Sequence, residues 1–423
     1  MKLKEYKLGE LLDVTRGTSL SGEYYSTEGE RIRLTLGHFD YVNGGFKENT
    51  SKDNIYFTGD VKDEFILHEG DIITPLTEQT YGLIGSTAMI PESGKYIQSQ
   101  DIGLVKCNKE LLYPGFCYYL LPTQLVKNQL SAGAQQTSIR HTSPDKIKDC
   151  KVFIPSLSEQ KQIAKLLSNI DKKISINRSL NQNLEALAKQ LYDYWFVQFD
   201  FPNEEGKPYK SSGGKMVWNE TLKRNIPDGW SVFKIEEIAK TYSGGTPNST
   251  NEDYYKNGTI PWINSGELNN PIITTATNYI TQLGLNNSSA KLYPTNTILV
   301  ALYGATAGKV SFLALPACSN QAVCGVMPQK PSLTLYLYFA LTSMYERFVT
   351  LSTGSARDNI SQATIKHTQI IIPTDTILVQ FANITNEIMQ RMVNNQKECE
   401  ELTKLRNEVL PLLMNGQVSL NCD

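Results

Sequence analysis

Polar side chains in glycine-rich loops are the residues of this sequence best suited to chemistry. They supply amides, hydroxyls, a lysine and guanidinium groups, which can pair with base edges and phosphates. Each could equally be a turn residue that satisfies its own backbone. Seven lie in each half of the chain: Gln79, Thr80, Tyr81, Gln135, Gln136, Thr137 and Arg140, then Asn264, Tyr303, Thr306, Lys309, Ser355, Arg357 and Asn359. Arg357 is the strongest single candidate, because it lies in a Gly-Ser-x-Arg loop before an apolar strand.

No motif for catalysis accompanies these loops. The segment 304–310 is close to a P-loop, but three residues rather than four separate its glycines, and Val310 follows Lys309 where Ser or Thr should hold magnesium. Neither Gly-x-Gly-x-x-Gly nor an Asn- or Asp-Pro-Pro-aromatic tetrapeptide occurs. The histidines show no metal-ligand spacing: His38, His68, His141 and His367. We therefore expect no catalysis, and no metal or cofactor bound by this chain.

The two sets of loops belong to an internal repeat. Leu130-Ser131-Ala132-Gly133 recurs as Leu351-Ser352-Thr353-Gly354 at an offset of 221, which Gln100 and Gln321 share. After a three-residue slip, Ile154-Pro155 matches Ile372-Pro373. The copies differ almost everywhere else, which favours two similar modules that recognise different things.

A long helix is predicted after each copy. Ser156-Leu157-Ser158-Glu159 has the spacing of a capping box, and apolar residues then recur every three or four positions to about Phe199. A helix of ~38 residues is ~57 Å long, which is typical of a coiled coil. The predicted core of a helix pair is Ile163, Leu167, Ile170, Ile174, Asn177, Leu184, Leu191 and Trp195 in the first helix and Phe381, Ile388, Met392, Asn395, Leu402 and Val409 in the second.

Asn177 and Asn395 occupy equivalent positions near the middle of these two helices. If the helices run antiparallel about a pseudo-twofold axis, the two asparagines should face each other. A buried polar pair would then fix the register of the helices. The alternative is two asparagines on the surface.

The order of elements predicts an α+β fold. We expect two β-rich domains in tandem, each followed by a long helix, with the helices paired as an antiparallel coiled coil with pseudo-twofold symmetry. The predicted bounds are 1–155 for the first β-rich domain, 156–201 for the first helix, 202–226 for a polar linker, 227–374 for the second β-rich domain and 375–423 for the second helix and tail. Within the first domain, strands are expected at 30–34, 71–74 and 103–106, and a helix at 113–125.

Composition fits an ordinary soluble protein, with 423 residues, 40% of them hydrophobic and 20% charged, and a net charge of −2. Seven scattered cysteines without a Cys-x-x-Cys pair favour free thiols in the cytoplasm. We expect neither a signal peptide nor a membrane span. Residues 140–178 carry nine Lys or Arg against four Asp or Glu, without a counterpart in the second copy. A solvated helix face would explain this excess as well as a nucleic-acid contact would.

Short strings recur in a fixed order in both copies. The second copy contains Ser243-Gly244-Gly245-Thr246-Pro247, Ile260-Pro261-Trp262-Ile263-Asn264, Asn320-Gln321-Ala322 and Thr353-Gly354-Ser355-Ala356-Arg357. The first keeps Arg16-Gly17-Thr18, Gly70-Asp71-Ile72-Ile73 and Gly133-Ala134-Gln135-Gln136-Thr137 but lacks Gly-Gly-Thr-Pro and Ile-Pro-Trp. In this order, over essentially the whole chain, the strings resemble the specificity subunit of type I restriction–modification systems. The resemblance adds Arg16, Thr18, Gly245 and Thr246 to the candidate DNA-contacting residues.

The resemblance implies a non-catalytic subunit that reads double-stranded DNA. Each β-rich domain would be a target-recognition domain, and the paired helices would set the distance between two half-sites about one DNA turn, ~34 Å, apart. Two methyltransferase subunits carrying S-adenosylmethionine, and translocase–nuclease subunits using ATP and magnesium, would be the partners. No membrane would be involved.

Two other classes of function stay open. A freestanding nuclease or methyltransferase would need the motifs that are absent, and methyl transfer by the purified chain alone would support it. A non-DNA adaptor or scaffold with two β domains on a coiled coil fits the same order of elements. Salt dependence separates it from a DNA-binding protein, because phosphate contacts make DNA affinity fall steeply as salt increases.

Overall fold

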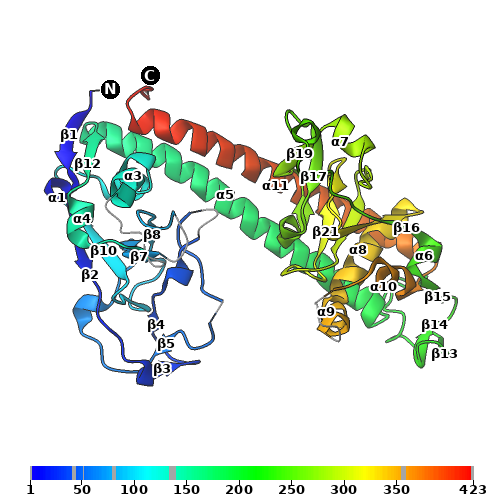
Figure 1. Cartoon of the computed structure of the whole chain (residues 1–423). Helices are drawn as coiled ribbons and strands as arrows, with labels where there is room; N and C mark the ends of the chain where they lie inside the picture. Colours follow the sequence, from blue (N-terminus) through cyan, green and yellow to red (C-terminus); the bar gives the residue numbers. More distant parts are fainter. Residues whose placement is uncertain are drawn as a thin grey trace. The chain divides into compact units, whose positions relative to one another are not determined.

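The chain forms two compact units (Figure 1). The structure is a computed structural model that describes all residues except 1, 41–43, 51, 79–81, 133–139, 354–358 and 421–423. Unit 1 comprises Met1–Lys173 and Leu402–Asp423, and unit 2 comprises Ile174–Glu401. Unit 1 is therefore assembled from segments that are far apart in the sequence.

Unit 1 is built on a four-stranded antiparallel sheet with the strand order β2–β10–β6–β8. The strands are β2 (Leu12–Arg16), β10 (Ile102–Cys107), β6 (Ile72–Pro75) and β8 (Ala88–Met89). Adjacent residues point to opposite faces, as the pleat requires. Ile72 and Val105 pack in a cluster with α2 (Pro114–Leu120) and α3 (Gln124–Ala132), whereas Ile73 and Leu104 pack in a second cluster with Ile32. Both faces of the sheet are thus buried.

Smaller elements complete unit 1. A second sheet has the order β3–β5–β4–β9, and two further strand pairs are β1–β12 and β7–β11. Their bounds are β3 (Tyr25–Ser26), β5 (Tyr56–Phe57), β4 (Ile32–Arg33), β9 (Tyr96–Ile97), β1 (Lys4–Lys7), β12 (Lys151–Ile154), β7 (Thr77–Glu78) and β11 (Arg140–His141), with helices α1 (Leu8–Leu11) and α4 (Pro144–Lys148). The predicted strands are found, and the predicted helix 113–125 is present as α2.

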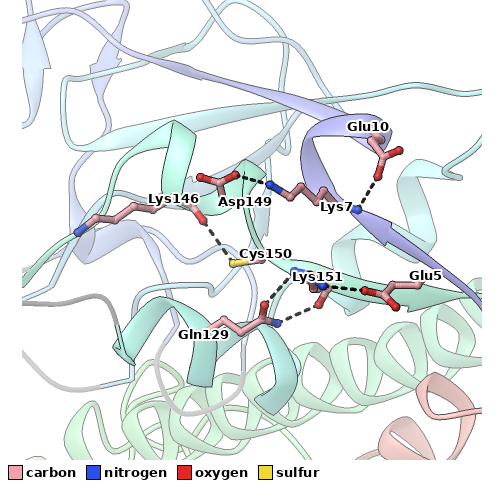
Figure 2. Close-up of polar contacts among 8 residues, drawn as sticks. All are labelled: Glu5, Lys7, Glu10, Gln129, Lys146, Asp149, Cys150 and Lys151. Carbon is pink, nitrogen blue, oxygen red and sulfur yellow. Dashed lines mark hydrogen bonds and ion pairs between the residues drawn. The ribbon is translucent and has the colours of Figure 1, made fainter.

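Strand β12 is tied both to the start of the chain and to helix α3 (Figure 2). Lys151 lies 3.1 Å from Glu5 of β1, with which it forms an ion pair. The Lys151 N–H donates to Gln129 Oε1 at 2.8 Å, and Gln129 Nε2 donates back to the Lys151 carbonyl at 2.9 Å. This reciprocal pair of hydrogen bonds fixes α3 on β12.

Unit 2 repeats the same arrangement, which confirms the internal repeat. Its main sheet has the order β16–β23–β20–β21–β18, and the first four strands match β2–β10–β6–β8. A second sheet pairs β17 with β22 in parallel, as β4 pairs with β9 in unit 1. The bounds are β16 (Ala239–Ser243), β23 (Val323–Pro328), β20 (Thr297–Ala301), β21 (Val310–Leu313), β18 (Ile272–Ile273), β19 (Asn278–Ile280), β17 (Ile260–Ile263), β22 (Cys318–Ser319), β15 (Ser231–Lys234), β24 (Gln369–Ile372), α6 (Ile235–Ile238), α7 (Gln282–Asn286), α8 (Thr334–Ser343), α9 (Tyr345–Thr353) and α10 (Gln362–His367).

The two long helices are α5 (Leu157–Tyr192), which one π-helical turn extends over Asp193–Val197, and α11 (Asp375–Met414). The capping box at the start of α5 is formed, because the Ser156 N–H donates to Glu159 at 3.0 Å and the Glu159 N–H donates to Ser156 Oγ at 3.4 Å. Pro411 lies within α11 without ending it.

Inside unit 2 the two helices run antiparallel. From the N-terminal to the C-terminal end of α5 and its π-helical extension, Ile174 contacts Cys399, Asn181 contacts Asn395, and the Trp195 ring lies 5.8 Å from the Phe381 ring. The partner residues on α11 thus follow in descending order. Of the fourteen predicted core positions, eight are buried and six are half-buried. The buried ones are Ile163, Leu167, Ile170, Ile174, Asn177, Trp195, Phe381 and Met392; the half-buried ones are Leu184, Leu191, Ile388, Asn395, Leu402 and Val409.

Asn177 and Asn395, which were predicted to face each other, have other hydrogen-bond partners. Asn177 is 1% exposed and donates to Glu398 at 2.6 Å. Asn395 donates to the side chain of Asn181 at 2.9 Å, and Asn181 donates to the Met392 carbonyl at 3.0 Å. The seam contains further polar residues that the heptad pattern did not single out, so each asparagine finds a partner one helical turn away from the expected one.

The segment 202–226 is not the linker that its composition predicts. It contains a β-hairpin of β13 (Met216–Asn219) and β14 (Arg224–Pro227). Phe201 stacks between Tyr209, at 4.6 Å, and Trp230, at 5.0 Å. Since three aromatic rings exclude water together, they hold a polar stretch in place.

Candidate nucleic-acid interface

One edge of unit 2 gathers most of the described candidates from the second copy. Strands β16 and β20 end at this edge, and β23, which pairs with both in antiparallel fashion, begins there. Parallel strands β17 and β22 also end at it, and Asn320 after β22 donates from its backbone to Ile263 at 3.0 Å. The loops that leave these strands therefore lie together.

Two glycines let the loop after β16 approach its neighbours. A Cβ on Gly244 would lie 2.2 Å from the Asn320 carbonyl oxygen, and one on Gly245 would lie 2.3 Å from Ser289 Oγ. Any side chain at either position would collide. Trp262 donates from its ring N–H to the Gly245 carbonyl at 3.0 Å. Gly245 is buried and shapes the loop, whereas Thr246 beside it is exposed.

Polar side chains of this edge contact one another. Thr246 hydrogen-bonds Gln321, and Asn320 Nδ2 donates to Asn264 Oδ1 at 3.1 Å. The backbone of Asn264 donates to Glu267 at 2.9 Å, which fixes the loop after β17. Gln321 is exposed and belongs with the candidates. The sequence analysis used Gln321 as a marker of the repeat and within a string of the family resemblance, but did not name it as a DNA-contacting candidate.

The remaining described candidates of unit 2 lie on or near the loop that follows β20. Tyr303 and Asn359 form a β-bridge, and Asn359 is exposed. Lys309 hydrogen-bonds Asn269 through its ammonium group. Thr306 is only 5% exposed, so its side chain packs inside the turn.

Unit 1 has an equivalent edge. Arg16 is exposed at the end of β2, and Thr18 forms a β-bridge with Ser99. Gly17 matches Gly244, because a Cβ there would lie 2.3 Å from the Ser99 carbonyl oxygen. Arg140 pairs through its backbone with Glu78, and its side chain lies outside the described part. Eight further candidates lie outside the described residues: Gln79, Thr80, Tyr81, Gln135, Gln136, Thr137, Ser355 and Arg357.

The thiols near this edge of unit 2 are not nucleophiles. Burial raises the pKa of Cys318 and of Cys324 to about 12 each. Both therefore stay protonated at neutral pH, and the thiolate is the reactive form. In the described ranges, no three His, Cys, Asp or Glu side chains come together as metal ligands would. The arrangement presents hydrogen-bonding groups at a surface.

Comparison with known proteins identifies the family. Residues 2–186 and 227–409 each match the type I restriction modification DNA specificity domain. The chain belongs to this family. A specificity subunit of a type I system is a recognition subunit and not a catalytic one, and its two domains serve DNA recognition.

Similar specificity subunits come from distant organisms. That of the type I restriction enzyme MjaIX from Methanocaldococcus jannaschii is 26% identical over 310 residues, which cover 72% of this chain and 68% of that protein. That of HindI from Haemophilus influenzae is 24% identical over 375 residues, covering 76% and 81%. The crystal structure of an S subunit from M. genitalium has a TM-score of 0.61 at 17% identity, covering 98% of this chain and 96% of that one. This last likeness shows the fold.

None of the helices in the described part of the chain has the length and apolar character that crossing a bilayer requires.

Proposed function

We propose that each unit reads one half of a bipartite DNA target with a fixed gap. In unit 1 the reading surface would be the edge formed by the loops after β2 and β6, and in unit 2 the edge formed by the loops after β16, β17 and β20. The observation that carries this proposal is that one strand arrangement occurs twice with different loop residues. Arg16 and Thr18 in unit 1 stand where Ser243 and Gly245 stand in unit 2. Two domains with the same strand arrangement but different hydrogen-bonding groups in their loops are suited to bind two different base sequences.

The proposed partners are two methyltransferase subunits, joined by translocase–nuclease subunits where cleavage occurs. These partners would supply S-adenosylmethionine, ATP and magnesium, and the complex would act in the cytoplasm. The specificity subunit would contribute the choice of site, through side chains that meet base edges and phosphates.

Exposed apolar residues on the long helices support one docking face on each helix. On α5 and the π-helical turn that extends it, Ile176, Leu180, Leu187 and Tyr194 are 55%, 46%, 53% and 38% exposed, and their spacings of four and seven place them on one face. At the offset of 218 that relates the helices, Leu187 and Tyr194 correspond to Leu405 and Leu412 of α11, which are 46% and 38% exposed. An exposed apolar pair at matching positions of each helix fits two copies of one partner, docked through its own helices.

The function is tested by co-expressing this chain with its methyltransferase partner and mapping N6-methyladenine across the host genome. We expect a single split motif, two short blocks around a fixed gap. The control is the methyltransferase subunit expressed without this chain, which should leave no such motif. A soluble complex that methylates nothing, or methylates without a split motif, would contradict the proposal.

A further inference from the structure

A buried carboxylate in unit 1 binds the backbone of Gly82–Ile84, which follow β7 in the sequence. Glu78 is 3% exposed and is the last residue of this strand. Its Oε2 atom accepts hydrogen bonds from three consecutive backbone N–H groups, those of Gly82, Leu83 and Ile84, at 3.0, 2.8 and 2.9 Å. Hydrogen bonds to an ionised acceptor are the stronger class, and three on one oxygen fix the backbone closely.

A lysine of helix α3 binds the same segment of backbone. Lys127 of α3 donates from its ammonium group to the Gly82 carbonyl at 2.9 Å. Burial lowers the pKa of Lys127, and the charge of Glu78 acts in the opposite direction. Helix α3 is itself fixed by the reciprocal bonds between Gln129 and Lys151 (Figure 2). The carboxylate of Glu78 and the ammonium group of Lys127 therefore form a clamp on the backbone around Gly82.

Unit 2 builds the equivalent loop without this clamp. Leu76 and Leu302 are equivalent, because each accepts a backbone bond from the strand that returns to this edge, from Thr142 at 2.8 Å and from Ile360 at 2.6 Å. Glu78 thus corresponds to Gly304, whose φ of +83° suits glycine. The shorter loop 303–307 is closed by backbone bonds instead, among them Ala307 N–H to the Gly304 carbonyl at 3.0 Å.

We propose that Glu78 and Lys127 are positioning residues for recognition of the first half-site, acting through the backbone of Gly82–Ile84. This inference rests on the proposed function. Taking charged groups out of water is costly, and the equivalent loop of unit 2 is closed by backbone bonds. Since the fold does not need this clamp, we attribute to it a role specific to unit 1, which is to position the backbone around Gly82. Gln79, Thr80 and Tyr81, three of the candidate recognition residues, lie between Glu78 and Gly82 in the sequence.

The test uses the complex of the full chain with its methyltransferase partner and three duplexes. One carries the mapped target, one has the first half-site scrambled, and one has the second scrambled. For Glu78→Gln we expect the preference for an intact first half-site to fall by about tenfold or more, since a bond to a charged acceptor is weakened or lost. The preference for the second half-site should stay within twofold of wild type. Lys127→Gln should show a smaller loss in the same half-site.

Two control variants test whether the effect is specific to Glu78 and to the first half-site. Glu110→Gln changes an exposed carboxylate of unit 1 and should change neither preference. Glu267→Gln is the reciprocal change in unit 2, where Glu267 accepts from the backbones of Asn264 at 2.9 Å and Thr277 at 3.0 Å. It should lower only the preference for the second half-site.

Several outcomes would overturn the inference. Full preference for the first half-site in Glu78→Gln would do so, and so would equal weakening of both half-sites, which would mean a general loss of structure. If that variant does not fold, Lys127→Gln decides by the same criterion. If the wild-type complex itself prefers neither half-site, the proposed function fails, and the inference fails with it.

Discussion

Single residues in unit 1 show how far burial can set a protonation state. His38 is 1% exposed, and burial lowers its pKa to about 4. The geometry agrees, because the Thr35 N–H donates to His38 Nδ1 at 3.1 Å, which requires this nitrogen to lack a proton. The native ring is therefore neutral at neutral pH.

This buried ring makes the stability of unit 1 depend on pH. The unfolded chain takes up a proton near pH 6.5, whereas the native ring resists it down to about pH 4. The stabilisation is thus complete above pH 6.5 and is lost as the pH falls toward 4. Acidification from pH 7 to pH 4.5 should cost unit 1 about 2–3 kcal/mol at about 1.4 kcal/mol per pKa unit.

Urea unfolding followed by circular dichroism at both pH values measures this cost. His38→Gln should lower stability at pH 7 but flatten the pH dependence. His68→Gln, at an exposed histidine of the same unit, should leave the wild-type dependence in place. An unchanged loss of stability at pH 4.5 in the His38 variant would assign the effect to other groups.

At the scale of elements, helix α5 uses two faces for different purposes. One face carries buried residues such as Ile174, Ala188 and Trp195, and an adjoining face carries the exposed stripe that includes Leu187. Exposed apolar residues on one helical stripe are a common sign of an interaction surface. The residues of this stripe on α5, Ile176, Leu180 and Leu187, stay exposed to solvent within unit 2.

We expect Leu187→Asp to weaken binding of the methyltransferase partner by at least about tenfold, because it places a charge in an apolar contact. Fewer copies of the partner should co-purify with the tagged variant than with wild type, because the apolar pair on α11 is unchanged. Val379→Asp is the matched control, since Val379 is 47% exposed on α11 and is out of register with the seven-residue spacing of Leu405 and Leu412. Equal loss of the partner with both variants, or with neither, would contradict docking on this stripe.

At the scale of the whole molecule, the two compact units can be observed separately. All four tryptophans, Trp195, Trp218, Trp230 and Trp262, lie in unit 2. Tryptophan fluorescence therefore follows unit 2 alone, whereas circular dichroism follows both units. The end of α11 belongs to unit 1, where Leu413 is 0% exposed in the cluster that also contains Leu8 and Phe116.

Leu413→Ala should destabilise unit 1 by about 2–5 kcal/mol, the usual cost of emptying a buried leucine site. The unfolding midpoint seen by tryptophan fluorescence should not move, while the transition of unit 1 seen by circular dichroism should shift to lower urea. Leu412→Ala, at the exposed neighbour, should change neither. A matching shift of the tryptophan signal would mean that the units unfold together.

The sequence alone determined the elements and their order. The repeat, the capping box of Ser156 and Glu159, and the apolar period of both long helices are local patterns, and each was enough to predict its element. Family membership followed from the same strings, because their order along the chain is itself a feature of the sequence. The sequence could identify candidate DNA-contacting residues in the loops, but it could not predict which of them lie next to one another.

Only the tertiary structure decided which groups meet. The partners of Asn177 and Asn395 depend on the register of two helices more than 200 residues apart, which no local pattern contains. The stacking of Phe201 with Tyr209 and Trp230 folded a segment whose composition indicates a linker. In the sequence nothing distinguishes Glu78 from other polar residues. In the structure, β7 and α3 bring the carboxylate of Glu78 and the ammonium group of Lys127 to the backbone of Gly82. Such contacts depend on distances in space, which the chain sets only once its strands and helices have packed.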